Sequence, residues 1–122
     1  MLVKTPKYKQ IAENRWETVS VGIYYCKKLQ TNIIVPTGFI CNLASLPQFF
    51  VLCGMLDRYD ADIASVFHDY LYVTHKTSRA DADRIFYEIM NITKNPKGQW
   101  KRDLFYWAVK VFGSTGYKRR NF

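Results

Sequence analysis

The sequence predicts an α+β fold in a single domain of 122 residues, in which a small antiparallel β-sheet is followed by a bundle of three to four helices. Two patterns lead to this prediction. Residues 8–35 combine β-branched and aromatic side chains with partial alternation, which is typical of strands. Residues 48–113 carry apolar side chains at the three- and four-residue spacing of amphipathic helices.

The predicted strands occupy ETVSVGIYY and TNIIV, which are joined by a turn at residues 27–30. An irregular motif loop, residues 36–47, follows them. It contains Pro36 and Gly38, and Pro47 introduces a second bend. A short apolar helix is expected from Pro47 to about Met55.

Two further helices are expected to pack as an antiparallel pair, because the link between them is short. Asp57 or Asp60 can cap the first helix, which should end near Thr74. Ser78 should start the second helix, with Asp81 as the acid of a capping box. The apolar stripes of the two helices are Ile63, Val66, Phe67, Tyr70 and Leu71 in the first, and Ala82, Ile85, Phe86, Ile89 and Met90 in the second.

The last predicted helix runs from about Gln99 to Phe112, after a break at residues 95–98. Gly113 is expected to end it, which leaves residues 114–122 as a flexible basic tail. The residues expected to face inward are Leu104, Trp107, Ala108 and Val111.

The net charge of +8 favours anionic partners, namely nucleic acid, phospholipid head groups or an acidic protein surface. From Lys94 onward there are eight basic residues and one acid, whereas six of the ten acids lie between Asp57 and Asp83. No apolar run is long enough for a transmembrane segment, and the N-terminus lacks an apolar signal region, which predicts a cytoplasmic origin. Cys26, Cys41 and Cys53 have no metal-site or disulfide spacing and are expected to be reduced.

His68 and Asp83 are the candidate pair for chemistry, because each lies at the edge of an apolar stripe on one of the paired helices. A carboxylate on one ring nitrogen holds a histidine in one tautomer and makes it a better base. Asp69 points about 100° away around the helix and could reach a cation or a loop. The alternative is that His68 and Asp83 form a buried structural contact. Likewise, His75 is expected in a solvated loop, and Arg79 and Arg84 on the helix surface.

Three motifs resemble a phage and prophage family called domain of unknown function 1353. The motifs are VPTGFICNLASLP, ASVFHDYLY and SRADADRIFYEIM. Asn42 stands where the family usually has aspartate, and Ser45 belongs to the same motif. The resemblance implies a phage or prophage origin, with the protein in the host cytoplasm or the virion, and no established activity.

The His-Asp helix pair is also distantly similar to that of secreted phospholipases A₂. This resemblance implies that His68 activates water, that Asp83 orients it, and that Tyr72 hydrogen-bonds Asp83. It further implies Ca²⁺ or another divalent cation, held by Asp69 and by oxygens near Asn42. The phospholipase half-cystines are absent, since Leu71, Ala80 and Ala82 occupy such positions, and no glycine-rich calcium loop is visible.

Three functions therefore remain open. The first is a non-catalytic virion, assembly or host-interacting protein with a structural His-Asp-Asp network. The second is a phospholipase A₂-like hydrolase that uses His68, Asp83 and a divalent cation. The third is a basic accessory protein that binds nucleic acid, although no recognised motif for this is present. Ser45, Lys118, Arg119 and Arg120 are the candidate binding residues for a partner protein or an anionic surface.

Overall fold

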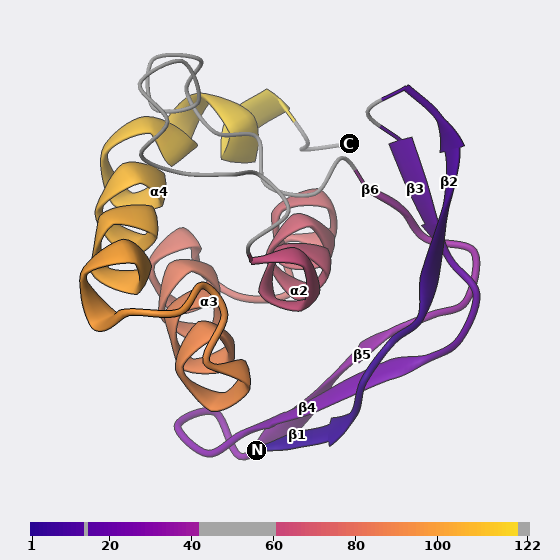
Figure 1. The fold of residues 1–122 in the computed structure, drawn as a ribbon, viewed down its shortest axis with the longest axis horizontal. Helices are drawn as coiled ribbons and strands as arrows, with labels where there is room; N and C mark the ends of the chain where they lie inside the picture. Colours follow the sequence, from indigo (N-terminus) through magenta and orange to yellow (C-terminus); the bar gives the residue numbers. More distant parts are fainter. Residues whose placement is uncertain (14, 42–60, 120–122) are drawn as a thin grey trace.

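The computed structural model describes residues 1–13, 15–41 and 61–119, with side chains as far as Val111 in the last range. Its strands are β1 (Leu2–Lys4), β2 (Tyr8–Ala12), β3 (Arg15–Thr18), β4 (Gly22–Cys26), β5 (Thr31–Val35) and β6 (Ile40–Cys41). Its helices are α2 (Asp62–Thr74), α3 (Arg79–Thr93) and α4 (Gln99–Arg119). Strands precede helices along the chain, so the predicted α+β class is confirmed (Figure 1).

The strands form two antiparallel sheets of three strands each, in the orders β1-β4-β5 and β2-β3-β6, where the sequence predicted one sheet. The strand region is also wider than residues 8–35, because β1 precedes it and β6 lies within the predicted motif loop. The predicted strand ETVSVGIYY is divided by a bend at residues 19–20, so its halves belong to different sheets. Gly22 begins β4, just after this bend. A Cβ on Gly22 would lie 2.8 Å from Cγ of Pro6, so a larger residue would not fit without a shift of the chain.

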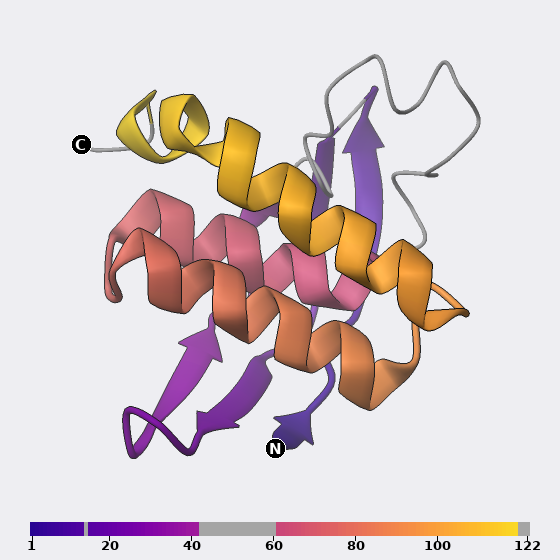
Figure 2. The ribbon, with the colours of Figure 1, turned by 90° about the vertical axis from the view of Figure 1, so that its left-hand side faces the viewer.

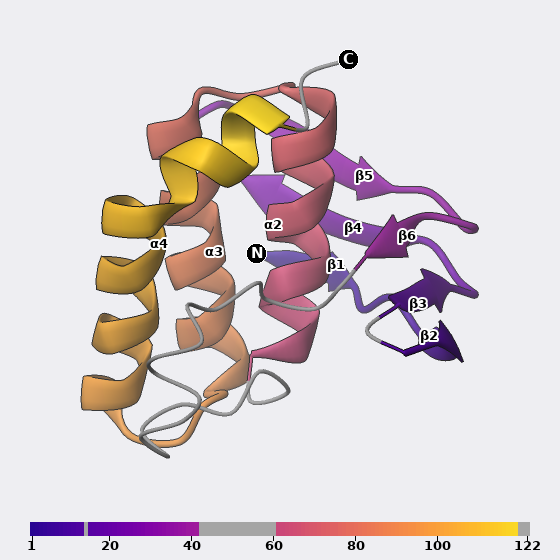
Figure 3. The ribbon, with the colours of Figure 1, turned by 90° about the horizontal axis from the view of Figure 1, so that it is seen from above.

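Helix α2 lies between the strands and the other two helices (Figure 3). All residues from Ala64 to Tyr72 are buried, so the helix is enclosed on every side rather than along one stripe. It begins at Asp62 with Ala61 as its N-cap, and this N-cap makes no side-chain hydrogen bond. The prediction of an Asp57 or Asp60 cap was therefore wrong. The helix ends at Thr74 as predicted, where His75 adopts a left-handed conformation.

Helix α3 agrees closely with the sequence prediction. Ser78 is its N-cap, and the Ser78 hydroxyl accepts a hydrogen bond from the backbone N–H of Asp81 at 3.1 Å. All five residues of the predicted stripe are buried. Helices α2 and α3 lie side by side, and α4 packs mainly against α3 (Figure 2).

Helix α4 differs from the prediction in length and in orientation. It continues to Arg119, so Gly113 does not end it and residues 114–119 are helical rather than a loose tail. A glycine inside a helix costs only about 1 kcal/mol relative to alanine, which a long helix tolerates. Of the four residues expected inward, Ala108 is buried and Leu104 is partly buried against the core, whereas Trp107 and Val111 are 50% and 49% exposed. Phe105, which was not predicted, is fully buried against α3 residue Phe86.

No helix among the described residues is long and apolar enough to cross a membrane. The short helix predicted from Pro47 to about Met55 lies outside the described residues, as do Asn42, Ser45 and Arg120.

Candidate functional site

The packing of α2 against α3 brings His68 and Asp83 into direct contact. The ring Nε2 of His68 lies 2.8 Å from Oδ1 of Asp83, as the spacing of the two residues along their helices predicted. His68 is 7% exposed and Asp83 is 2% exposed. A carboxylate buried to this extent needs partners for its oxygens, because leaving water without new hydrogen bonds is costly.

Tyr72 supplies a second hydrogen bond to the same carboxylate. Its hydroxyl donates to Oδ1 of Asp83 at 2.6 Å, from a position one helical turn after His68. Burial, together with the hydrogen bond to Asp83 and its negative charge, raises the pKa of the Tyr72 phenol well above its usual value. The phenol therefore stays protonated and acts as a donor.

Arg79 approaches the other side of the carboxylate, a position that the sequence analysis missed by placing Arg79 on the helix surface. Its Nε lies 3.9 Å from Oδ2 of Asp83, and this buried nitrogen has no hydrogen-bond partner among the described residues. Its Nη2 donates to the backbone carbonyls of Val109, at 3.0 Å, and Lys110 in α4. The spacing of four residues between Arg79 and Asp83 was the available signal, since such pairs are neighbours on a helix.

The contact with Asp83 determines which nitrogen of His68 is available for chemistry. An ionised carboxylate can only accept hydrogen bonds, so Nε2 of a neutral His68 carries the proton and Nδ1 carries the lone pair. Among the hydrogen bonds of the described residues, none involves Nδ1. The histidine is thus held through Nε2, while its basic nitrogen, Nδ1, has no hydrogen-bond partner within the part of the chain that the structure describes.

Aromatic rings hold the imidazole in place. The ring centroid of His68 lies 4.1 Å from that of Tyr72 and 4.7 Å from that of Phe86. These contacts limit rotation of the imidazole and surround it with mostly apolar atoms. A low-dielectric setting of this kind strengthens its electrostatic interaction with Asp83.

The described residues contain no cluster of carboxylates around Asp69. Asp69 follows His68 on α2 and is buried, at 4% exposure. No group of three or more histidine, cysteine, aspartate or glutamate side chains that could hold a metal occurs within the described ranges. Ca²⁺ takes six to eight oxygen ligands. Of the two predicted ligands, Asp69 alone is described, because Asn42 lies outside these ranges.

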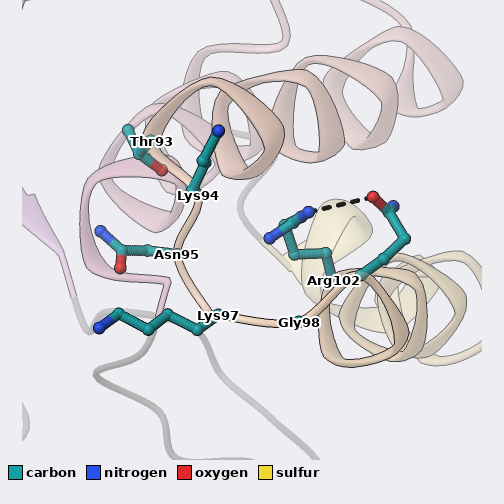
Figure 4. Close-up of a pocket in the computed structure, with 7 residues that line it drawn as sticks. Thr93, Lys94, Asn95, Lys97, Gly98 and Arg102 are labelled. Atoms are coloured by element: carbon teal, nitrogen blue, oxygen red, sulfur yellow. Dashed lines mark hydrogen bonds between the residues drawn. The ribbon is translucent and has the colours of Figure 1, made fainter.

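A cavity of about 520 Å³ lies apart from this site, between the end of α3 and the start of α4 (Figure 4). It is lined by Thr93, Lys94, Asn95, Lys97, Gly98, Gln99 and Arg102. The Arg102 guanidinium is occupied by Gln99 Oε1, Asn91 Oδ1 and the Pro96 carbonyl. Arg102 therefore joins α3 to α4, and Lys94 and Lys97 supply the remaining positive charges of the cavity.

The model of a family described as protein of unknown function, DUF1353, matches residues 17–109. The chain belongs to this family. The resemblance predicted from the three motifs is confirmed to that extent. The matched DUF1353 range contains His68, Tyr72, Arg79 and Asp83, so the whole polar network lies within the family region. No curated protein and no solved structure matches the chain.

The other predicted binding residues remain without a described contact. Lys118 and Arg119 lie in the last turn of α4, beyond the described side chains, and Ser45 and Arg120 lie outside the described ranges. The structure thus brings together His68, Tyr72 and Asp83, adds Arg79, and does not describe a contact between these four and the predicted anion-binding residues.

Proposed function

We propose that the protein is a small hydrolase in which His68 is the general base, oriented by Asp83 and Tyr72. One observation supports this proposal most directly. His68 is held through Nε2 by a buried carboxylate, while its Nδ1 has no hydrogen-bond partner among the described residues. In a purely structural network, both ring nitrogens are usually satisfied.

The proposed reaction is hydrolysis of an ester. Nδ1 of His68 takes a proton from water as the water oxygen bonds to the ester carbonyl carbon. The negative charge of Asp83 stabilises the imidazolium that forms. The imidazolium then returns the proton to the departing alkoxide, which leaves a carboxylic acid and an alcohol as products. Tyr72 and Arg79 keep the carboxylate in position and contact no reacting atom. No step of this scheme passes through a metal ion.

An anionic phospholipid is the substrate class that the charge of the protein favours. The chain carries a net charge of +8, which attracts it to negatively charged lipid surfaces. The order of His68, Asp69 and Tyr72 on one helix and Asp83 on the next is similar to that in secreted phospholipases A₂. This similarity supports a phospholipid ester as the first substrate to test.

The test is release of fatty acid from vesicles of phosphatidylglycerol and phosphatidylcholine, measured with added calcium and with a chelator. We expect wild-type activity that is lost in His68→Asn and Asp83→Asn, two substitutions that retain polar side chains of similar size.

His75→Asn is the matched control, since His75 is the other histidine of the chain and asparagine tolerates its left-handed backbone conformation. This variant should keep wild-type activity. A folded wild type without hydrolysis under both conditions, or an active His68→Asn variant, would overturn the proposal.

The low exposure of His68 and Asp83 favours a second function. In it, the protein is a non-catalytic phage protein, and the hydrogen bonds of the network only stabilise the packing of α2 against α3. A virion, assembly or host-interacting component would need this stable packing, but it would not need a histidine that a substrate can reach. In that case, His68→Asn and Asp83→Asn lower stability, and the wild type releases no fatty acid.

A further inference from the structure

The turn between α3 and α4 borders the open cavity of about 520 Å³ (Figure 4). Residues 93–98 line one side of it, and Gln99 and Arg102 from the first turn of α4 line the other. A residue with a positive φ angle stands at each end of the turn, namely Lys94 at 54° and Gly98 at 93°. The volume lies within the range of small-ligand sites, which is about 300–1,000 Å³.

The cavity is positively charged. Lys94, Lys97 and Arg102 line it, and no aspartate or glutamate does. None of these three cations forms an ion pair within the part of the chain that the structure describes. Asp103, the next acid along the sequence, is not among the lining residues. The cations of the cavity therefore have no carboxylate in direct contact among the described residues.

The start of α4 is an unfavourable place for positive charge. A helix carries a partial positive charge at its N-terminus, where acidic residues are stabilising and cations are not. The first turn of α4 contains no acid, and it carries Lys101 and Arg102 instead. An anion in the cavity would offset this repulsion. The same arrangement that costs stability in the free protein thus favours binding of an anion.

Arg102 is held in position by uncharged acceptors. Its Nε donates to Asn91 Oδ1 at 2.8 Å, its Nη1 to the Pro96 carbonyl at 3.0 Å, and its Nη2 to Gln99 Oε1 at 3.0 Å. These bonds fix the guanidinium without neutralising it, and in Figure 4 it points toward the turn. A guanidinium has five N–H donors, so one N–H remains on Nη1 and one on Nη2. Such a fork matches the oxygens of a phosphate group.

We propose that this cavity binds the phosphate group of a small phosphorylated ligand, carried by a soluble phosphomonoester or by a lipid head group. A phosphomonoester has a charge of about −1.5 to −2 at pH 7 and three strong acceptor oxygens. Arg102 donates to it through its remaining N–H groups, and Lys94 and Lys97 supply the other positive charges. Lys97 extends away from Arg102 in Figure 4, and its flexible stem lets it turn toward a bound anion.

The cavity is separate from the proposed hydrolytic site. Asp83 and Thr93 are ten residues apart on α3, which corresponds to about 15 Å along the helix. A phosphate in the cavity is therefore too far away to belong to an ester bond that reaches His68 directly. Binding in the cavity does not rest on the proposed hydrolysis, so His68→Asn should bind phosphate like the wild type.

The test is a titration of isotope-labelled protein with glycerol phosphate, followed by the NMR signals of the backbone amides of residues 93–102. Sodium chloride at the same ionic strength provides the reference. We expect saturable shifts in this segment with glycerol phosphate only. The Lys94→Asn/Lys97→Gln double variant should bind about tenfold more weakly, because two of the three cations are lost. Asparagine tolerates the left-handed backbone conformation of Lys94.

Lys7→Gln/Arg15→Gln is the matched control, because it removes the same charge from two exposed positions in the strand region. It should bind glycerol phosphate like the wild type, which separates a local site from attraction by net charge. Thermal melting of each variant shows whether it is folded.

Vesicles that contain phosphatidic acid identify the source of the phosphate group. Co-sedimentation that glycerol phosphate reverses, and that the Lys94→Asn/Lys97→Gln variant loses, identifies a lipid head group. Saturable shifts without co-sedimentation identify a soluble phosphomonoester. Absence of saturable shifts in the wild type would overturn the proposal. Equal affinity of the folded double variant and the wild type, or equal weakening in the double variant and its control, would overturn it as well.

Discussion

Two regions of the molecule differ in which side chains they bury. The α2–α3 interface buries polar side chains, whereas the outer face of α4 exposes apolar ones. The interface buries a histidine, a carboxylate and a phenol within an apolar core, with His68 at 7% and Asp83 at 2% exposure. The outer face of α4 exposes two tryptophans and a valine while the core takes Phe105 and Ala108. Polar residues are thus buried in one region and apolar residues are exposed in the other.

Both arrangements oppose the usual distribution of side chains, and each has its own cost. Buried polar groups lose hydration and must recover it through hydrogen bonds, whereas exposed apolar surface lowers solubility. The polar groups between α2 and α3 recover much of that loss through mutual contacts.

The largest effect is expected for Asp83→Ala, which leaves the buried donors of His68 and Tyr72 without their acceptor. Removing one member of a buried charged network costs about 3–5 kcal/mol of unfolding free energy. Urea denaturation of the variant and the wild type measures the loss. Arg84→Ala, at the next and exposed position of α3, should change stability by less than about 0.5 kcal/mol. Equal losses in the two variants would mean that the network does not support the fold.

The orientation of α4 is tested by comparing the loss of unfolding free energy in Phe105→Ala with the loss in Trp107→Ala. Phe105 is fully buried and touches Phe86, so its truncation should cost about 3–5 kcal/mol. Trp107 is 50% exposed, and its truncation should cost clearly less although the side chain is larger. Thermal and urea denaturation compare the two. A larger loss for Trp107→Ala would contradict this orientation of α4.

Tyr72→Phe should cost about 1 kcal/mol, because one hydrogen bond to Asp83 is lost while the ring contacts remain. The pKa of Tyr72 is raised in the folded protein, so its contribution is present below the unfolded pKa near 10 and is lost as the pH rises further. The stability difference from the wild type should therefore be constant from about pH 7 to 9 and shrink above about pH 10. Denaturation across this pH range provides the measurement, and a constant difference above pH 10 would contradict the assignment.

The smallest effect concerns the contact between the strand region and α3. Lys28 Nζ lies 2.6 Å from Oδ1 of Asp81, and this hydrogen bond lowers the pKa of Asp81. A lowered pKa gives stability that is present above the unfolded pKa, near 4, and is lost as the pH falls through the folded value. Lys28→Ala should cost less than about 1 kcal/mol at pH 7, because the pair is partly exposed. The difference in unfolding free energy between wild type and Lys28→Ala should become smaller below pH 4. A difference that becomes larger there would refute the contact between Lys28 and Asp81.

The α2–α3 region could be predicted from the sequence because its signals are local or separated by few residues. The Ser78 cap and the α3 stripe depend on neighbours within one or two helical turns, and a short link forces the two helices to pack antiparallel. The contact of His68 with Asp83 follows from these facts. The position of Arg79 could not be predicted from these local signals. Its guanidinium donates a hydrogen bond to a backbone carbonyl of α4, thirty residues further along the chain.

Helix α4 shows what the sequence alone determined and what the tertiary structure decided. The sequence determined that residues from Gln99 onward form a helix with apolar positions on more than one face, since periodicity and propensity are local properties. Only packing decided that Phe105 and Ala108 face the core and that Trp100 and Trp107 face outward. An amphipathic pattern specifies a buried arc, but the shape of the α2–α3 surface selects which of two apolar arcs fits against it. The division of the strands into two sheets was decided in the same way, by long-range pairing that no local pattern encodes.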